Sequence, residues 1–247
     1  MSQNYITEEV KIKGYEADFN GFLKPSFLLG VFQEIAVAHS EKMGLGFSDL
    51  EARGMFWVLS KIYVEIESLP KSGDLIRVST WPHKPGKAIF ERSYEIENAE
   101  GKVVVRGYSR WCILRKDNFR IVSSSEVPDN IGNFVERKSV EFNNWQIPVV
   151  SKTDASYSIC IRNAEYDRNR HLNNIRYADF IFDCFSVEEL DSMRLKNFQL
   201  HYLKQSYEND VVDFYREDCG NGEYVVEGVN RNGDRVVSAR VCFIKND

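Results

Sequence analysis

The sequence predicts an α+β fold made of two similar units, each with one helix packed against an antiparallel sheet. Two observations support this prediction. A short polar motif near residue 18 recurs near residue 167, and both copies are followed by an apolar, helix-like segment and then by several strand-like segments. With 247 residues, 43% of them hydrophobic and 28% charged, the chain can bury one large core or two smaller ones.

The repeated motif has the frame D-x-N-x-[F/H]-L. The first copy is DFNGFL, residues 18–23, and the second is DRNRHL, residues 167–172. Because aspartate and asparagine before a helix are most often caps, we expect Asp18 and Asn20 to cap the helix that follows.

The first helix is predicted between Pro25, which suits a first turn, and Gly44, where a helix would stop. Apolar residues recur between them at helical spacing, which indicates one buried face. These residues are Phe27, Leu28, Val31, Phe32, Ile35 and Ala38. In the second unit, Asn173 or Asn174 can cap a corresponding helix. Its apolar stripe comprises Ile175, Ala178, Ile181, Cys184 and Phe185.

Strand-like segments follow each predicted helix in the same order. Residues 58–66 and 194–202 alternate apolar and polar side chains, and turn residues separate each from a second, shorter strand. A hairpin then completes each unit, with its turn at Glu100-Gly101 in the first and at Asn232-Gly233 in the second. Each helix is apolar over much of its surface, so a sheet is expected to wrap around it.

Residues 126–150 have little periodicity, and we interpret them as a linker. The expected domains are therefore residues 1–125 and residues 151–247, joined by that linker. Because two fused units already provide the pairing that a single unit would seek in a partner, the chain is expected to be a monomer or a homodimer.

Composition and charge exclude several classes of protein. The net charge is −5 without a long basic block, which argues against a nucleic-acid partner. No apolar run approaches the roughly 18 residues of a membrane span, and the first residues lack a secretory pattern, so we expect a cytoplasmic protein with no membrane contact. The five scattered cysteines form no C-x-x-C pair, and the four histidines lack metal-ligand spacing. We therefore expect reduced cysteines that serve in packing, no metal and no cofactor.

Three motifs carry a resemblance to a known family. They are MFWVLSKIYVEIESLPKSGDLIRVSTW from Met55 to Trp81, a GK-x-x-x-x-R frame from Gly86 to Arg92, and D-x-N-x-H-x-N-N-x-x-Y from Asp167 to Tyr177. In this order, the chain resembles the acyl-acyl carrier protein thioesterases of the plant and bacterial type over nearly its whole length. The resemblance implies a double hotdog fold and hydrolysis of the thioester of fatty acyl chains on acyl carrier protein. It also implies that Asp167, Asn169 and His171 form the catalytic set.

The family usually has a glutamate in a strand frame resembling L-x-Y-x-x-E. This chain reads Leu200-His201-Tyr202-Leu203-Lys204-Gln205, so Gln205 occupies the glutamate position and is a further candidate for the site. An amide can position a water molecule but cannot deprotonate it.

The chemistry of the second motif fits thioester hydrolysis, which needs a proton carrier and hydrogen-bond donors for a developing negative oxygen. In an extended segment, Asp167, Asn169 and His171 would point to one side, before a helix whose free N–H groups favour an oxyanion. His171 is the expected proton carrier, Asn169 the donor, and Asp167 the orienting carboxylate or the direct nucleophile. Phe22 replaces the histidine in the first copy, so we expect a single active site, in the second unit.

Candidate substrate-binding residues lie mainly in the first unit. Met55, Trp57 and Phe32 are expected to line an acyl pocket, with ordinary core packing as the alternative. A second group, expected to contact the acidic carrier protein, has a solvated loop as its alternative and comprises Lys84, Lys87 and Arg92.

Other functions fit the same residues. An acyl-coenzyme A thioesterase of the same fold is one alternative, and a hotdog hydratase acting on enoyl thioesters is another. The absence of the glutamate at position 205 favours a non-catalytic acyl-binding module. A hydrolase that uses Cys184 as nucleophile is a further alternative, although the place of Cys184 on an apolar helix stripe favours packing.

Overall fold

The computed structural model describes residues 4–127, 134–151, 153–167 and 170–246. The chain divides into two compact units, Met1–Phe142 and Asn143–Asp247. None of the helices in the described ranges combines the length and apolar composition that crossing a membrane requires.

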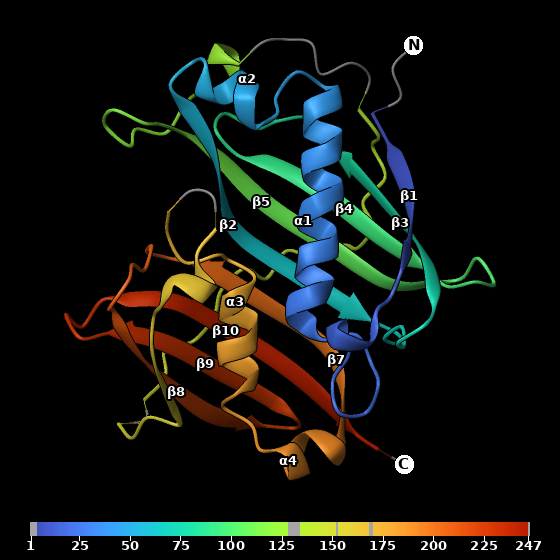
Figure 1. Cartoon of the computed structure of the whole chain (residues 1–247), viewed down its shortest axis with the longest axis vertical. Helices are drawn as coiled ribbons and strands as arrows, with labels where there is room; N and C mark the ends of the chain where they lie inside the picture. The colour runs from blue at the N-terminus through green and yellow to red at the C-terminus, as the bar shows by residue number, and fades with distance from the viewer. Residues whose placement is uncertain (1–3, 128–133, 152, 168–169, 247) are drawn as a thin grey trace. The chain divides into compact units, whose positions relative to one another are not determined.

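In the first unit, helix α1 (Pro25–Lys42) lies across one face of an antiparallel sheet (Figure 1). The strands follow the spatial order β1 (Ile6–Lys11), β3 (Leu75–Pro82), β4 (Phe90–Glu97), β5 (Val103–Arg115) and β2 (Met55–Ile66). Short helices accompany them, namely η1 (Gly14–Glu16), α2 (Phe47–Glu51) and η2 (Ser124–Glu126).

The second unit has the same strand order with shorter helices. Its antiparallel sheet runs β6 (Tyr157–Cys160), β8 (Val211–Gly220), β9 (Glu223–Asn230), β10 (Arg235–Lys245) and β7 (Met193–Tyr202). The helices are η3 (Asn163–Glu165), α3 (Arg176–Phe182) and α4 (Val187–Asp191). The predicted α+β fold of two helix-in-sheet units is therefore confirmed.

The turn residues between β2 and β3, and those between β7 and β8, do not connect paired strands. Within the first unit, β2 pairs with β5, whereas β3 pairs with β1 and β4. Turn residues after β2 mark a change of direction, but they do not decide which strand becomes the neighbour. The hairpin turns at Gly101 and Gly233 are confirmed, and both glycines have positive φ, 76° and 79°.

Helix α1 buries one face against the sheet of its unit. Phe32 is 1% exposed, and its ring stacks on Tyr94 of β4 with centroids 4.5 Å apart. A Cβ atom at Gly107 of β5 would lie 2.5 Å from the Phe32 ring, so this close approach requires glycine. The buried stripe also contains Leu29 and Ala36, while the predicted core residues Phe27, Val31 and Ala38 are only half-buried.

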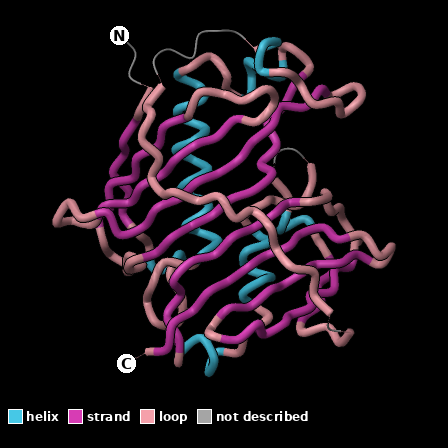
Figure 2. The backbone as a smooth tube through the Cα atoms, turned by 180° about the vertical axis from the view of Figure 1, so that it is seen from behind, coloured by secondary structure: helices cyan, strands magenta, loops and turns pink. Residues whose placement is uncertain are grey.

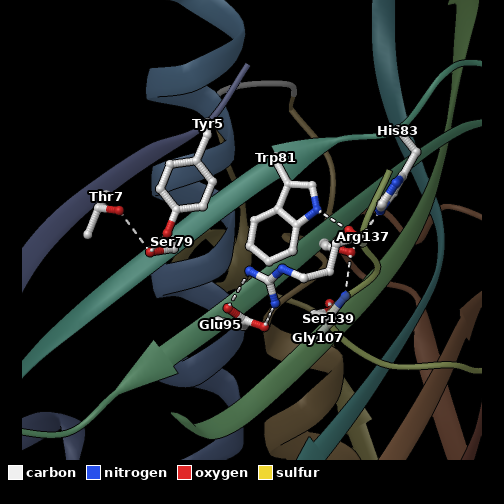
Figure 3. A network of polar contacts seen from close by, with 10 residues as sticks. Tyr5, Thr7, Ser79, Trp81, His83, Glu95, Gly107, Arg137 and Ser139 are labelled. Carbon is white, nitrogen blue, oxygen red and sulfur yellow. Dashed lines mark hydrogen bonds and ion pairs between the residues drawn. The ribbon is translucent and has the colours of Figure 1, made fainter. Parts of the chain in front are cut away.

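The opposite face of this sheet is covered by the chain after η2. Seen from behind, the strands lie in front of the helices and a loop runs across them (Figure 2). Arg137 forms a two-pronged ion pair with Glu95, and its carbonyl accepts the indole N–H of Trp81 at 2.6 Å (Figure 3). Ser139 donates its hydroxyl to the Gly107 carbonyl at 2.6 Å. The described part of the predicted linker before residue 143 is thus packed onto the first unit.

Candidate active site

The described ends of both copies of the repeated motif are joined by the same backbone hydrogen bond. Asp18 N–H donates to the Phe22 carbonyl at 2.7 Å, and Asp167 N–H donates to the His171 carbonyl at 3.1 Å. Flanking bridges join Ala17 with Leu23 and Tyr166 with Leu172. The duplication seen in the sequence is therefore a duplication of local structure.

The prediction that Asp167 and His171 lie along an extended segment is wrong. The chain reverses instead, because Arg170 N–H donates back to the Asp167 carbonyl at 3.1 Å and Arg170 adopts a positive φ of 62°. Asn169 lies outside the described residues, so its placement stays a prediction. The described ends of the turn, Asp167 and His171, are joined through their backbones and both are half-buried.

In the first copy, the carboxylate of Asp18 accepts the backbone N–H groups of Asn20 and Phe22, both at 2.9 Å. The helix begins only at Pro25, with Lys24 as its N-cap. Asp18 thus closes the turn, and the expectation that Asp18 and Asn20 cap α1 is wrong. An aspartate side chain reaches the N–H groups two to four residues ahead, and here those belong to the turn.

The imidazole of His171 is oriented by the backbone. Its Nδ1 lies 3.0 Å from the carbonyl oxygen of Leu172. Because a carbonyl can only accept a hydrogen bond, Nδ1 carries the proton in the neutral ring and Nε2 keeps its lone pair. His171 is therefore built to accept a proton at Nε2.

Gln205 lies beyond the end of β7 and not inside the strand, in a loop that runs beside the His171 turn. Leu172 N–H donates to the Ser206 carbonyl at 3.0 Å, which places the two segments side by side. The amide oxygen of Gln205 accepts the hydroxyl of Tyr207 at 2.7 Å, so the amide N–H groups remain as donors. The structure thus brings the Gln205 segment to the backbone of the His171 turn.

Helix α3 is shorter than the sequence predicts. It spans 7 residues and stops at Phe182, and α4 begins only after Ser186. The Asn173 side chain accepts Ile175 N–H at 3.2 Å, which organises the turn before the helix. A helix of this length has few aligned peptide dipoles, so the expected help from its N-terminus is small.

The proposed acyl-pocket residues all lie in the first unit but do not form one group. Met55 and Trp57 belong to an apolar cluster beside α2, where the Trp57 indole donates to the Leu45 carbonyl at 2.9 Å. Phe32 instead belongs to α1 and stacks on Tyr94.

Arg92 cannot contact a carrier protein, which corrects the sequence prediction. It is 7% exposed, and Nη1 lies 3.0 Å from His39 Nδ1 and 3.3 Å from the Thr80 hydroxyl. Strand alternation points Arg92 inward, whereas the loop residues Lys84 and Lys87 are exposed. Burial and the neighbouring Arg92 lower the pKa of His39 to about 4, so His39 is neutral and accepts from the guanidinium.

The cysteines differ in environment. Cys184 is buried and its thiol donates to the Phe180 carbonyl at 3.5 Å, and burial raises its pKa to about 12. A thiol of this kind is a poor nucleophile at neutral pH. All five cysteines are free, and Cys219 is exposed, contrary to the expectation that each serves in packing. Within the described ranges, the chain gathers no group of three or more potential metal ligands.

Two family models cover most of the chain. The acyl-ACP thioesterase N-terminal domain matches residues 3–133, and the acyl-ACP thioesterase C-terminal domain matches residues 150–245. The oleoyl-acyl carrier protein thioesterase 2 of Arabidopsis thaliana is 25% identical over 94% of this chain and 68% of its own length. The palmitoyl-acyl carrier protein thioesterase of Cuphea hookeriana is 25% identical over 83% of this chain and 53% of its own length. The chain thus spans about half to two thirds of these relatives.

Two solved structures share the fold over the whole chain. An acyl-ACP thioesterase from Bacteroides thetaiotaomicron superposes with a TM-score of 0.84 at 23% identity, covering 99% of this chain and 100% of the other. The 12:0-ACP thioesterase from Umbellularia californica gives a TM-score of 0.86 at 20% identity, covering 100% and 99%. Both likenesses support the double helix-in-sheet architecture.

Proposed function

The chain belongs to the acyl-ACP thioesterase family, and we propose that it hydrolyses the thioester between a fatty acyl chain and acyl carrier protein. The products are the free fatty acid and the thiol of the carrier. The observation that carries this proposal is the hydrogen bond from His171 Nδ1–H to the Leu172 carbonyl, which leaves the Nε2 lone pair available in the turn of the family motif.

In the proposed reaction, His171 Nε2 accepts a proton from a water molecule while the water oxygen attacks the thioester carbonyl carbon. The carbonyl oxygen becomes negative and needs hydrogen-bond donors. The free amide N–H groups of Gln205 suit this role, because its amide oxygen is already occupied by Tyr207. Collapse of the tetrahedral intermediate breaks the carbon–sulfur bond, and the imidazolium returns its proton to the departing sulfur.

Two roles near His171 rest on the sequence. Asn169 is proposed to hold the carbonyl or the attacking water through its side-chain amide. Asp167 is proposed to orient the neighbouring groups, and direct attack by its carboxylate on the thioester is the alternative route. A single turnover in heavy-oxygen water tests direct attack, because an unlabelled enzyme oxygen in the released acid could come only from the carboxylate.

The carrier is tested by offering one acyl chain on two carriers. The same dodecanoyl or oleoyl chain is attached to acyl carrier protein and to coenzyme A, and free thiol is measured under identical conditions. We expect a higher kcat/KM with the carrier protein. A higher kcat/KM with coenzyme A would establish the coenzyme A thioesterase alternative. With an enoyl thioester as the substrate, loss of the double bond without thiol release would establish a hydratase.

Lys84 and Lys87 are proposed as contacts for the acidic carrier protein, because both are exposed on one loop. The double change Lys84→Glu and Lys87→Glu should raise KM for the acyl carrier substrate and leave kcat unchanged, since the charges guide association without touching the thioester. Lys11→Glu, at an exposed position of β1, is the charge-reversal control outside this loop. Equal KM values for the two charge-reversed proteins would remove this loop from the interface.

A further inference from the structure

Tyr177 and Ser206 form a buried hydrogen-bonded pair in the second unit. Tyr177 comes from α3 and is 2% exposed, while Ser206 follows β7 and is 0% exposed. Their hydroxyl oxygens are 2.8 Å apart, and the Tyr177 hydroxyl also lies 3.5 Å from the Lys204 carbonyl. The pair therefore ties α3 to both residues that flank Gln205.

The same pair is connected to His171 through the backbone of one residue, Leu172. The Ser206 carbonyl accepts Leu172 N–H at 3.0 Å, and the Leu172 carbonyl lies 3.0 Å from His171 Nδ1. The Tyr177 hydroxyl is thus bonded to the Ser206 hydroxyl, Leu172 N–H donates to the Ser206 carbonyl, and the imidazole Nδ1–H donates to the Leu172 carbonyl. A shift of the loop would move the acceptor that fixes the tautomer of His171.

The first unit shows that the fold itself does not require these hydroxyls. Leu28 stands as far beyond Asp18 as Tyr177 stands beyond Asp167, and it is fully buried. Leu23 N–H donates to the Pro70 carbonyl at 2.8 Å, so Pro70 takes the backbone role of Ser206. An apolar leucine and a proline fill these places in the copy whose turn carries Phe22. Buried hydroxyls are costly unless they are hydrogen-bonded. At these two positions, hydroxyls occur only in the copy that contains the histidine.

We propose that Tyr177 and Ser206 are positioning residues that hold the Gln205 loop and the backbone of Leu172, and through Leu172 the tautomer and orientation of the His171 ring. This inference rests on the proposed function for its kinetic test. It assigns a role to the tyrosine that closes the D-x-N-x-H-x-N-N-x-x-Y motif.

The kinetic test compares Tyr177→Phe, Ser206→Ala and the double variant with the parent. Each change removes a single hydroxyl oxygen. We expect each single change to lower kcat about tenfold, with KM within about twofold, because the loss acts on the reacting groups and not on substrate binding. The double variant should lose no more than the larger single loss, since both changes remove one shared hydrogen bond.

A matched control separates positioning from stability. Tyr5 also donates its hydroxyl to a serine, Ser79, at 2.9 Å, on the sheet face of the first unit away from α1 (Figure 3). Tyr5→Phe should leave kcat at the parent value. In a His171→Ala background, Tyr177→Phe should lower the residual rate no further, because its effect passes through His171. A kcat within twofold of the parent for Tyr177→Phe, or a full tenfold loss in the His171→Ala background, would overturn the proposal.

A readout that needs no turnover keeps this inference distinct from the proposed function. Nitrogen-15 NMR of the histidine rings reports which ring nitrogen carries the proton, with His171→Ala identifying the signal. We expect an Nδ1–H ring in the parent and a shift toward Nε2–H in the Tyr177→Phe/Ser206→Ala protein. An unchanged tautomer in the double variant would overturn the positioning role, whereas an inactive parent with the expected shift would contradict only the proposed function.

Discussion

The Leu172 carbonyl oxygen and His171 Nδ1 lie 3.0 Å apart, within a turn that the chain builds twice. In the first copy, the corresponding hydrogen bond joins Asp18 N–H to the carbonyl of Phe22, which takes the position of His171. A phenyl ring neither accepts nor donates a proton. The duplicated turn therefore supplies a scaffold in both units and a proton acceptor in only one.

His171→Ala should lower kcat by about 10²- to 10⁴-fold, as expected for loss of a general acid–base group. Phe22→Ala is the matched control, because it truncates the equivalent side chain of the first turn. It should reduce the melting temperature and leave kcat near the parent value. Thiol release at saturating substrate measures kcat for both variants. A loss of tenfold or less in the His171 variant would remove this residue from the mechanism.

Asn20→Ala and Asn169→Ala should behave differently, although the two residues match in the repeat. Asn20 is exposed and donates only its backbone N–H to Asp18, so its truncation should cost well under about 1 kcal/mol and leave kcat unchanged. Asn169→Ala should lower kcat by about 10²-fold, as for a donor aimed at developing charge. Melting temperature and kcat are measured for both variants. Equal losses of kcat would contradict a single active site.

Gln205→Glu tests whether the loop after β7 faces the reacting groups. The substitution keeps an oxygen for the Tyr207 hydroxyl and replaces the free N–H donors with a titrating carboxylate. We expect a lower kcat if the amide stabilises the oxyanion, and an added ionisation in the pH–rate profile. A profile and a kcat that both match the parent would place Gln205 outside the site.

Cys184→Ala should leave kcat within about twofold of the parent, because burial raises the pKa of this thiol to about 12 and little thiolate exists at neutral pH. Iodoacetamide at pH 8 should label exposed Cys219 first and leave Cys184 unmodified, as mass spectrometry of peptides would show. Inactivation that follows the labelling of Cys184 would revive a cysteine nucleophile.

Acidification should destabilise the protein through His39. Burial and Arg92 lower the pKa of His39 from 6.5 to about 4 in the folded chain. Between these values the unfolded state binds more protons, so the free energy of unfolding falls as the pH decreases, by up to about 3 kcal/mol from this group. His39→Gln keeps an acceptor for Arg92, and its free energy of unfolding should change less between pH 6.5 and pH 4 than that of the parent. The free energy of unfolding is measured with urea at each pH. An equal loss of this free energy between pH 6.5 and pH 4 in the two proteins would contradict this assignment.

Local features of this fold could be predicted from the sequence because they depend on neighbouring residues. Helix α1 lies between Pro25 and Gly44 as its spacing predicts, and the hairpin turns fall at Gly101 and Gly233, where backbone with positive φ favours glycine. The duplicated motif and its histidine are also visible in the sequence, and they identified the family. Periods of 3.6 and 2.0 and turn chemistry are properties of short segments.

Contacts between residues far apart in the sequence determined the strand partners and the buried face of each side chain. Strand β2 pairs with β5 and not with β3, and Arg92 faces His39 beneath α1, because the partner of each strand and the buried face of each side chain depend on residues far along the chain. The reversal at Asp167, which the sequence frame could not distinguish from a strand, follows from hydrogen bonds between backbone groups. The Tyr177–Ser206 contact joins a helix to the loop after a strand. Only tertiary structure brings such residues together, since no local period relates them.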